Sequence, residues 1–430
     1  MRVFGCFVSR PFLFGMTSIA LLSGCALLPS FHPPLDGNRA FIVYWPPATN
    51  STQLKLAVKD NIDMKGVVTT AGSEHLARIG KPAKKDASCL ELARLRNVQI
   101  VGKANLSEFA VSPSGFNEYF GTPESPLSGS RKLLPGGSSC GSAVAVARGM
   151  ADVAFGTDTA GSIRVPAAWC GIVGLKTTHG LVPIKGVFPI EPKHLDTVGP
   201  MGKDILHTVL GMDLLQKGFA ELYDEAVRAK PSAQDIRIGR LTLEGTDPRI
   251  DQAVDEALAK TGFQVVQLDD RVRKEWEQAK KDGNTIAAAG AWISDKRFLY
   301  AWGVSARTES AILVGQLAYL TSYVEAVARQ ARWQNTLKEL FKKVDFIALP
   351  TVQTTPPLIP LNLKISFLEA HVLELQNTVA VNFAGNPALA LPIPLHDDEV
   401  AVTSLQLVGP RLSEAQLLNA GRLVEAAVNR

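Results

Sequence analysis

Cysteine is scarce in this sequence, with five residues in a chain of 430. So few cysteines exclude a fold held together mainly by disulfides. Neither sign of charge is in excess, since 45 Lys and Arg stand against 41 Asp and Glu, and no block of like charge occurs. This balance argues against nucleic acid as the main partner. The seven histidines are scattered, so a Ser-His-Asp mechanism has no specific support.

The first 25 residues have the pattern of an export signal. Arg2 and Arg10 are the only charged residues there, and an apolar run follows at residues 12–22. Eleven helical residues span ~16 Å, about half of a ~30 Å bilayer core, which disfavours a membrane-spanning helix. The pattern of positive charge, apolar run and small residues predicts a secretory signal peptide.

The end of this signal resembles a bacterial lipobox, in which the cysteine becomes the lipidated N-terminus. The residues concerned are Leu22-Ser23-Gly24-Cys25. We therefore predict a lipoprotein-type signal peptide at residues 1–24 and a membrane anchor through lipid on Cys25. The protein would then be exported to the bacterial cell envelope and face the periplasm. The alternative is an ordinary signal peptide that contains Cys25 by chance.

Residues 25–52 are interpreted as the lipidated cysteine and a tether, because they hold several prolines and few periodic apolar positions. Beyond them, short apolar runs alternate with helix-like segments, which is typical of an α/β fold with a buried sheet. Residues 306–343 are expected to be helical, with one break. Because no internal repeat or convincing linker occurs, we predict one large domain at 53–430. Strands are expected at residues 54–58, 98–101, 151–155, 171–175, 236–241, 263–268, 344–349, 388–391 and 404–408, and further helices at 142–148, 249–261 and from 413.

A glycine- and serine-rich segment at residues 134–143 offers three interpretations. A phosphate cradle would need the Lys-Ser/Thr of a P-loop, which is missing. A nucleophile elbow would use Ser139 in Gly137-Ser138-Ser139-Cys140-Gly141, but residues 128–132 before it are polar and unlike the required strand. The third interpretation is a Ser-Ser-Lys hydrolase.

Two other segments favour the third interpretation. Three small residues precede Ser162 after a predicted strand, so backbone N–H groups could converge on one point as an oxyanion hole requires. Lys59 stands at the end of another apolar strand, where desolvation would lower its pKa from about 10.4 and allow it to act as a base. A Ser–Lys pair is a known variant of the catalytic triad.

At this point the sequence resembles the amidase signature family over most of residues 53–425. The matching motifs are Lys59-Asp60-Asn61, Thr70-Ala71-Gly72-Ser73, Gly102-Lys103-Ala104-Asn105, Glu108-Phe109-Ala110, residues 136–142, residues 156–166, residues 170–177, Asp196-Thr197-Val198-Gly199-Pro200-Met201, Leu349-Pro350-Thr351, Gly385-Asn386-Pro387-Ala388 and Leu405-Gln406-Leu407-Val408-Gly409. The resemblance implies a mixed, twisted β-sheet covered by helices on both faces, and hydrolysis of a carboxylic amide C–N bond.

The resemblance also implies roles for individual residues. Ser162 would be the nucleophile, Ser138 a bridging serine after a cis Gly137–Ser138 bond, and Lys59 the base. No metal or organic cofactor would be needed. The oxyanion hole would be formed by the N–H groups of Thr159, Ala160, Gly161 and Ser162.

Some further residues are interpreted as supports of the site, and others differ from the usual pattern of the family. Ser139, Asp158 and Arg164 are interpreted as supports of the site, with Asp158 and Arg164 expected to pair. Three residues differ from the usual family pattern, namely Ala104, Cys140 and Ala160. None of these changes removes a catalytic group.

The substrate is expected to be a small-molecule or peptide amide. Selectivity would come from residues 111–135, 185–195 and 285–345, where aromatic side chains suggest an apolar acyl group or simply core packing; they are Trp292, Phe298, Tyr300 and Trp302. Two other functions remain open. One is a non-catalytic binding lipoprotein, and the other is a glutamine-amidotransferase-like subunit, against which the export signal argues. The sequence does not indicate the oligomeric state.

Overall fold

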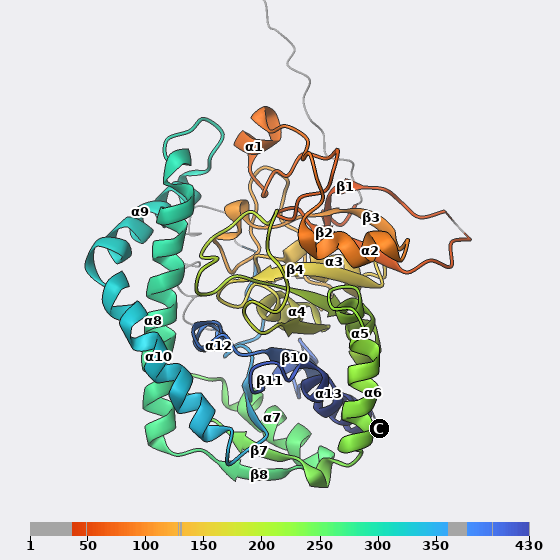
Figure 1. Ribbon diagram of the computed structural model, residues 1–430, viewed down its shortest axis with the longest axis vertical. Coiled ribbons are helices and arrows are strands. Elements are labelled where there is room, and N and C mark those ends of the chain that lie inside the picture. Colours follow the sequence, from red (N-terminus) through yellow and green to blue (C-terminus); the bar gives the residue numbers. More distant parts are fainter. Residues whose placement is uncertain are drawn as a thin grey trace, which may run out of the picture. The chain divides into compact units, whose positions relative to one another are not determined.

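The computed structural model describes residues 37–48, 50–127, 129, 131–359, 376–397 and 399–429. The predicted signal peptide and Cys25 lie outside these residues. One sheet of eleven strands forms the centre, in the order β1-β3-β2-β4-β6-β5-β10-β11-β9-β7-β8 (Figure 1). The strands are β1 Phe41–Tyr44, β2 Lys55–Lys59, β3 Gln99–Ala104, β4 Val153–Asp158, β5 Val173–Lys176, β6 Thr197–Gly202, β7 Arg237–Arg240, β8 Gln264–Gln267, β9 Phe346–Pro350, β10 Ala388–Pro394 and β11 Val402–Val408.

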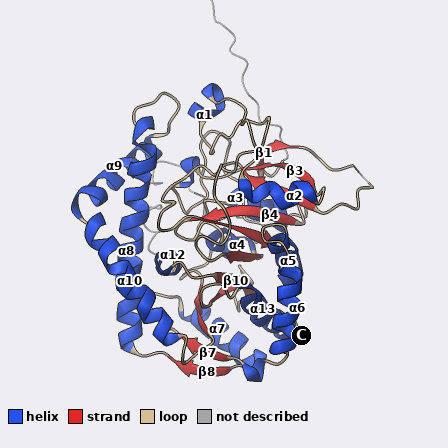
Figure 2. Cartoon of the chain, in the orientation of Figure 1, coloured by secondary structure: helices blue, strands red, loops and turns tan. Residues whose placement is uncertain are grey.

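The sheet is mixed, as predicted. β3, β2 and β4 are mutually parallel, the strands from β4 through β6, β5, β10 and β11 to β9 pair antiparallel, and β9, β7 and β8 are again parallel. Helices flank the sheet in Figure 2. They are α1 Glu74–Ile79, α2 Glu91–Leu95, α3 Cys140–Ala147, α4 Arg164–Cys170, α5 Ile205–Asp213, α6 Phe219–Ala229, α7 Pro248–Thr261, α8 Asp270–Asp295, α9 Ala306–Thr321, α10 Tyr323–Leu340, α12 Val379–Ala384 and α13 Glu414–Val428, with short 3-10 turns between some of them.

Alternate residues of the central strands enter different cores, which is why helices cover both faces of the sheet. In β4, Val153 and Phe155 pack into a core with α5, α6, α7 and α13, whereas Ala154 packs toward α3 and α4. In β9, Phe346 joins the first of these cores and Ile347 joins a third one with α8, α10 and α12. This arrangement confirms the predicted single α/β domain with a doubly covered sheet.

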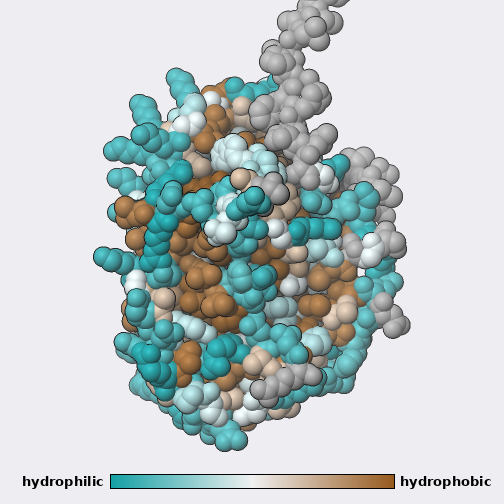
Figure 3. Space-filling view, turned by 90° about the vertical axis from the view of Figure 1, so that its right-hand side faces the viewer, coloured by the Kyte–Doolittle hydropathy of each residue, from teal (hydrophilic) through white to brown (hydrophobic). Residues whose placement is uncertain are grey.

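The predicted break in the helical segment after residue 306 is confirmed, because α9 and α10 are bent by 76° around Ser322. Among the described residues, no single helix is long and apolar enough to cross a bilayer, and only this bent pair reaches that threshold jointly. Figure 3 shows the side on which α5 and α6 lie in Figure 1, where hydrophobic areas are separated by hydrophilic side chains.

The ordered sheet begins before residue 53, where the sequence analysis had set the start of the folded domain. β1 lies inside the segment that was interpreted as a tether, and it pairs antiparallel with β3 as the edge of the sheet. Phe41 and Ile42 are buried there. The sequence pattern did not indicate this strand. Prolines lie near it, and its four residues are too few to show a clear alternation of apolar and polar positions. β6, α5, α6 and α8 were also missed as elements.

The three cysteines at 89, 140 and 170 are all free and buried. Burial raises the pKa of Cys140 to about 12, so its thiol is protonated at neutral pH. Cys170 donates to the carbonyl of Pro135 at 3.4 Å. These contacts are those of packed core cysteines.

Candidate active site

Lys59 lies at the carboxyl end of β2, between β3 and β4, and its side chain is fully buried. Its Nζ lies 2.8 Å from Ser138 Oγ, 2.8 Å from Thr157 Oγ1 and 3.4 Å from the Thr157 carbonyl oxygen. Asn61 Nδ2 donates to the same Thr157 hydroxyl at 3.0 Å. Two strand ends therefore fix the amine of Lys59 beside Ser138.

Burial lowers the pKa of Lys59 from 10.5 to about 7. Removing an ammonium group from water penalises the charged form, and this effect outweighs the opposing attraction of Asp158 and Asp196. About half of the enzyme would hold a neutral lysine at pH 7. A neutral amine has one lone pair, and Ser138 Oγ is close enough to give it a proton.

The glycine- and serine-rich segment reaches Lys59 through a turn that only glycine fits. The Gly137–Ser138 peptide bond is cis, as the resemblance implied. A Cβ on Gly137 would lie 2.5 Å from Gly115 N and 2.8 Å from Ser112 O. The N–H of Ser139 donates to the carbonyl oxygen of Ser162 at 3.2 Å, and this hydrogen bond connects the segment to the loop that contains Ser162.

Ser162 lies in the turn between β4 and α4, and the Asp158 carboxylate organises this turn. Asp158 accepts the N–H of Gly161 at 2.8 Å and that of Ile163 at 3.1 Å. It also forms the expected ion pair with Arg164, at 3.0 Å, with both side chains fully buried. The ion pair is the main reason that the pKa of Asp158 stays low, at about 2, despite burial.

These contacts correct one detail of the predicted oxyanion hole. The N–H of Gly161 is directed to Asp158 and is therefore engaged within the protein. The hydrogen bonds of the described residues leave the N–H groups of Thr159, Ala160 and Ser162 for the predicted hole. The resemblance had implied a hole with four donors, and the sequence alone does not show which way each N–H points.

Ser139 is not placed as a nucleophile elbow would place it. Its side chain is fully buried, and its Oγ donates to the Thr157 carbonyl at 3.3 Å. No strand lies in residues 131–138, and α3 begins directly after Ser139 at Cys140. Ser139 therefore contacts the loop as a supporting residue would.

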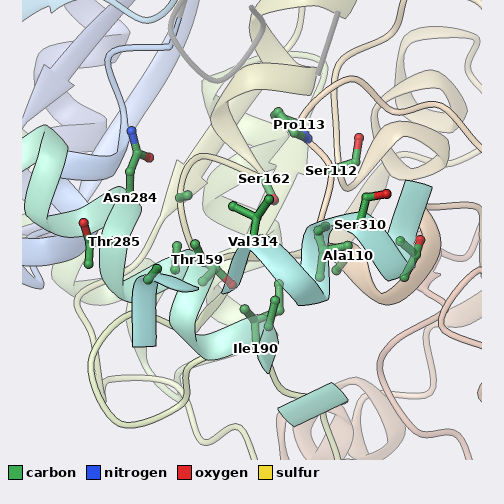
Figure 4. A pocket seen from close by; sticks show the side chains of 18 of the residues that line it. Ala110, Ser112, Pro113, Thr159, Ser162, Ile190, Asn284, Thr285, Ser310 and Val314 are labelled. Atoms are coloured by element: carbon green, nitrogen blue, oxygen red, sulfur yellow. The ribbon is translucent and has the colours of Figure 1, made fainter. Parts of the chain in front are cut away.

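A cavity of about 540 Å³ opens beside Ser162 (Figure 4). Its walls come from the loop at 110–113, from the turn that contains Ser162 and from the facing sides of α8 and α9. In Figure 4 the labelled side chains of Ser112, Thr285 and Val314 represent these walls. The predicted selectivity segments thus do supply much of the lining.

The four aromatic residues singled out in the sequence do not line this cavity. Phe298 packs on Phe109 with ring centroids 4.9 Å apart, while Tyr300 and Trp302 are exposed. The ammonium group of Lys296, directly after the end of α8, lies over the ring of Trp292. The apolar lining consists instead mostly of small side chains, among them Ala287, Ala288, Ala291, Ala311 and Ala318.

Sequence reasoning missed several residues that hold the site from a distance. Thr378 Oγ1 donates to the Ala160 carbonyl at 2.5 Å. Asn382 Nδ2 donates to Asp158 Oδ1 at 2.8 Å, and Gln406 Oε1 accepts from Arg164 at 2.7 Å. The quoted Leu405–Gly409 motif contained Gln406, but nothing local indicated its partner. Among the described residues, no group of three or more His, Cys, Asp or Glu side chains could hold a metal ion.

Comparison with known proteins identifies the family. The model of the amidase family matches residues 54–418. This chain belongs to the amidase family. It is an amidase, a hydrolase of amide C–N bonds, in keeping with the named activities of several relatives.

The amidase is 32% identical over 407 residues to a glutamyl-tRNA(Gln) amidotransferase subunit of Halobacterium salinarum, covering 86% of this chain and 94% of the relative. It is also 32% identical to 2-amino-5-chloromuconic acid deaminase of Comamonas testosteroni, covering 88% and 82% of the two chains. Its structure resembles the corresponding glutamyl-tRNA(Gln) amidotransferase subunit of Thermotoga maritima, with a TM-score of 0.75, 25% identity and coverage of 91% and 88%. Relatives that are named for different activities thus share this family.

Proposed function

We propose that this amidase cleaves its substrate through a Ser-Ser-Lys triad of Ser162, Ser138 and Lys59. The observation that supports this most directly is the 2.8 Å contact between Lys59 Nζ and Ser138 Oγ, together with a lysine pKa of about 7. Neutral Lys59 accepts the proton of Ser138, and Ser138 accepts the proton of Ser162. Ser162 Oγ then forms a bond to the amide carbonyl carbon.

The carbonyl oxygen of the substrate becomes negatively charged when this bond forms. The N–H groups of Thr159, Ala160 and Ser162 would donate to it, and backbone donors fixed in advance need no reorganisation. The tetrahedral intermediate expels the amine, which takes a proton relayed from Lys59 through Ser138. An acyl-enzyme on Ser162 and a neutral Lys59 remain.

Hydrolysis repeats the same proton movements with water as the nucleophile. Lys59 accepts a proton from water through Ser138, the hydroxide adds to the ester carbonyl, and Ser162 leaves with the proton returned by Lys59. The carboxylic acid departs and the enzyme is regenerated. Every proton is carried by residues of this chain, so the scheme uses no cofactor.

Labelling with a fluorophosphonate followed by peptide mass mapping tests the triad on residues 26–430. We expect an adduct on Ser162 that is lost in Ser162→Ala and slowed at least ~100-fold in Lys59→Ala. Ser142→Ala is the matched control, because Ser142 is a buried serine of α3 whose hydroxyl donates to the Phe155 carbonyl, outside the proposed relay. An adduct on Ser139, or labelling that does not depend on Lys59, would contradict the proposal.

We also propose that the enzyme is exported and anchored to the bacterial cell envelope by lipid on Cys25. The lipobox-like Leu22-Ser23-Gly24-Cys25 after a short apolar run supports this. Fractionation of cells should place the protein in the membrane fraction, and mass spectrometry should find lipid on an N-terminal Cys25. Cys25→Ala should release it from the membrane. Recovery of the native protein in the cytoplasm, with Met1 still present, would refute the proposal.

A second candidate function is the glutaminase step of an amidotransferase, because several relatives are named as components of such enzymes. That function requires release of ammonia from glutamine and a partner protein. Hydrolysis of simple amides by the purified chain alone, with poor hydrolysis of glutamine, would favour the independent amidase. A chain that labels at Ser162 but releases no product from any amide would favour the non-catalytic binding lipoprotein or a missing partner.

A further inference from the structure

The cavity beside Ser162 holds an amide side chain whose hydrogen-bonding groups lack strong partners. Gln376 lines this cavity and is only 2% exposed. Among the described residues, no group accepts a hydrogen bond from its Nε2. Leaving a buried polar group unpaired destabilises the free protein, so such a group beside the proposed nucleophile points to a ligand.

The carbonyl oxygen of the Gln376 side chain also lacks a strong hydrogen-bond donor. Its Oε1 lies 3.4 Å from Thr378 Oγ1, but that hydroxyl also contacts the Ala160 carbonyl at 2.5 Å. A hydroxyl has one proton, and the shorter contact takes it. Gln376 therefore presents both an N–H donor and a carbonyl acceptor, whichever way its amide is turned.

Gln376 is also placed next to the reacting groups. A Cβ built on Gly161 would lie 3.1 Å from Gln376 Oε1, so this side chain rests against the residue before Ser162. On α8, Asn284 lines the same cavity, and its Oδ1 is a second buried atom with no partner among the described residues. Two carboxamides thus have unused hydrogen-bonding capacity in a mainly apolar cavity.

Several other polar side chains of the lining are already engaged within the protein. Thr159 donates to Asp196 at 2.7 Å, and the hydroxyls of Thr285 and Ser310 donate to backbone carbonyls of their own helices at 3.0 and 2.8 Å. Arg307 is the one charged side chain in the described lining, and Glu118 binds its guanidinium at 2.9 and 3.1 Å. The cavity therefore suits an uncharged group.

We propose that Gln376 and Asn284 bind a second, neutral amide in the acyl part of the substrate. This rests on the proposed acyl-enzyme at Ser162, because the acyl part must stay in the cavity after the amine has left. A trans secondary amide has its carbonyl and its N–H on opposite sides, so the carbonyl accepts from Gln376 Nε2 and the N–H donates to Asn284 Oδ1. The substrate class is then an N-acylated amino-acid amide or another neutral diamide.

Binding to Ser162→Ala, measured by titration calorimetry, tests this without hydrolysis. The probes are N-acetylalanine p-nitroanilide and 2-methylpentanoic acid p-nitroanilide, which differ only by replacement of the second amide with two methylene groups. We expect the diamide to bind at least ~10-fold more tightly, since a site built to hydrogen-bond a group rejects the analogue that lacks it. Alanine p-nitroanilide, with its free ammonium group, should bind more weakly than the diamide.

Adding Gln376→Met to Ser162→Ala should bring the affinity ratio of the two probes close to one. Methionine keeps an unbranched side chain of similar length but removes the amide. Gln267→Met is the matched control, because Gln267 is exposed in β8. Asn284→Leu should lower the ratio independently, and it carries the test if Gln376→Met does not fold, as judged by circular dichroism.

An affinity ratio near one in Ser162→Ala, or a ratio that both folded variants leave unchanged, would overturn the inference. Failure of the proposed function gives a different result. In that case Ser162→Ala would still prefer the diamide, but the wild-type enzyme would neither hydrolyse it nor react with a fluorophosphonate at Ser162.

Discussion

The pH dependence of Ser162 reactivity is the most direct test of Lys59 as the base. An unperturbed lysine with a pKa of 10.5 would be neutral in only ~0.03% of molecules at pH 7, whereas a pKa of about 7 makes about half of them neutral. The difference corresponds to about 5 kcal/mol at ~1.36 kcal/mol per pH unit. Burial therefore raises the fraction of competent base more than about 1,000-fold at neutral pH.

The second-order rate of fluorophosphonate labelling is a suitable assay, since it needs no knowledge of the substrate. The rate should rise about ninefold from pH 5 to pH 6 and about fivefold from pH 6 to pH 7, because only neutral Lys59 can accept a proton. It should level off between about pH 7 and pH 8, once the lysine is mostly neutral. Lys59→Arg should be nearly unreactive throughout, since arginine stays protonated, and Lys260→Ala on the surface should follow the wild type.

A flat profile from pH 5 to pH 9 would refute a titrating base at this position. A midpoint above pH 9 would also refute the reasoning, because it would mean that burial does not lower the pKa of Lys59. A change of the reagent's own hydrolysis with pH is removed by measuring Lys59→Arg in parallel. The quantity that tests the prediction is therefore the ratio of the wild-type labelling rate to the Lys59→Arg labelling rate at each pH.

The remaining predictions concern the scaffold of the triad. Asp158→Asn should lower the free energy of unfolding by about 3–5 kcal/mol in denaturant titration, because it leaves a buried arginine without its counter-ion. Thr157→Val should slow labelling about 10–100-fold and lower the free energy of unfolding by about 1–3 kcal/mol, since it removes the hydroxyl that accepts from Lys59 Nζ and Asn61 Nδ2; an unchanged rate would argue against this role. Gly161→Ala should abolish labelling, because the new Cβ would lie 2.2 Å from a threonine hydroxyl at a φ of +134°. The folded-state pKa of Lys59 and Lys176 is about 7, below their unfolded value of 10.5, so the unfolded chain binds more protons between these values. Stability should therefore rise with pH over that range, and Lys176→Met should reduce the slope of melting temperature against pH.

The groups of the proposed triad could be found in the sequence because each lies in a locally distinctive segment. Lys59 ends an apolar strand, and Ser138 and Ser162 lie among glycines that close turns require. Their supports could not be found in this way. Thr378 and Asn382 contact the turn that contains Ser162 from more than 200 residues away along the chain, and both are polar residues in a stretch with no distinctive local pattern.

Among the elements, most strands in the middle of the sheet were easier to predict than the helices around it, although β6 was missed. Buried strands such as β4 are continuous apolar runs and show clearly in the sequence. α8 was missed because much of its buried side consists of small residues, including Ala279, Gly283 and Ala289. Small side chains give little hydrophobic periodicity, although they allow close packing of helices.

The same close packing explains why aromatic content misled the prediction of the cavity. Gly315 of α9 has no room for a side chain, since a Cβ there would lie 2.2 Å from the carbonyl oxygen of Ala288 in α8. Where two helices approach this closely, the side chains beside the contact must also be small, and Ala291 and Ala311 line the cavity there. The open volume thus arises from the absence of large side chains between α8 and α9. Replacing Ala291 by leucine should fill part of this volume, and should weaken binding of branched acyl groups to Ser162→Ala while leaving fluorophosphonate labelling of an otherwise wild-type chain unchanged.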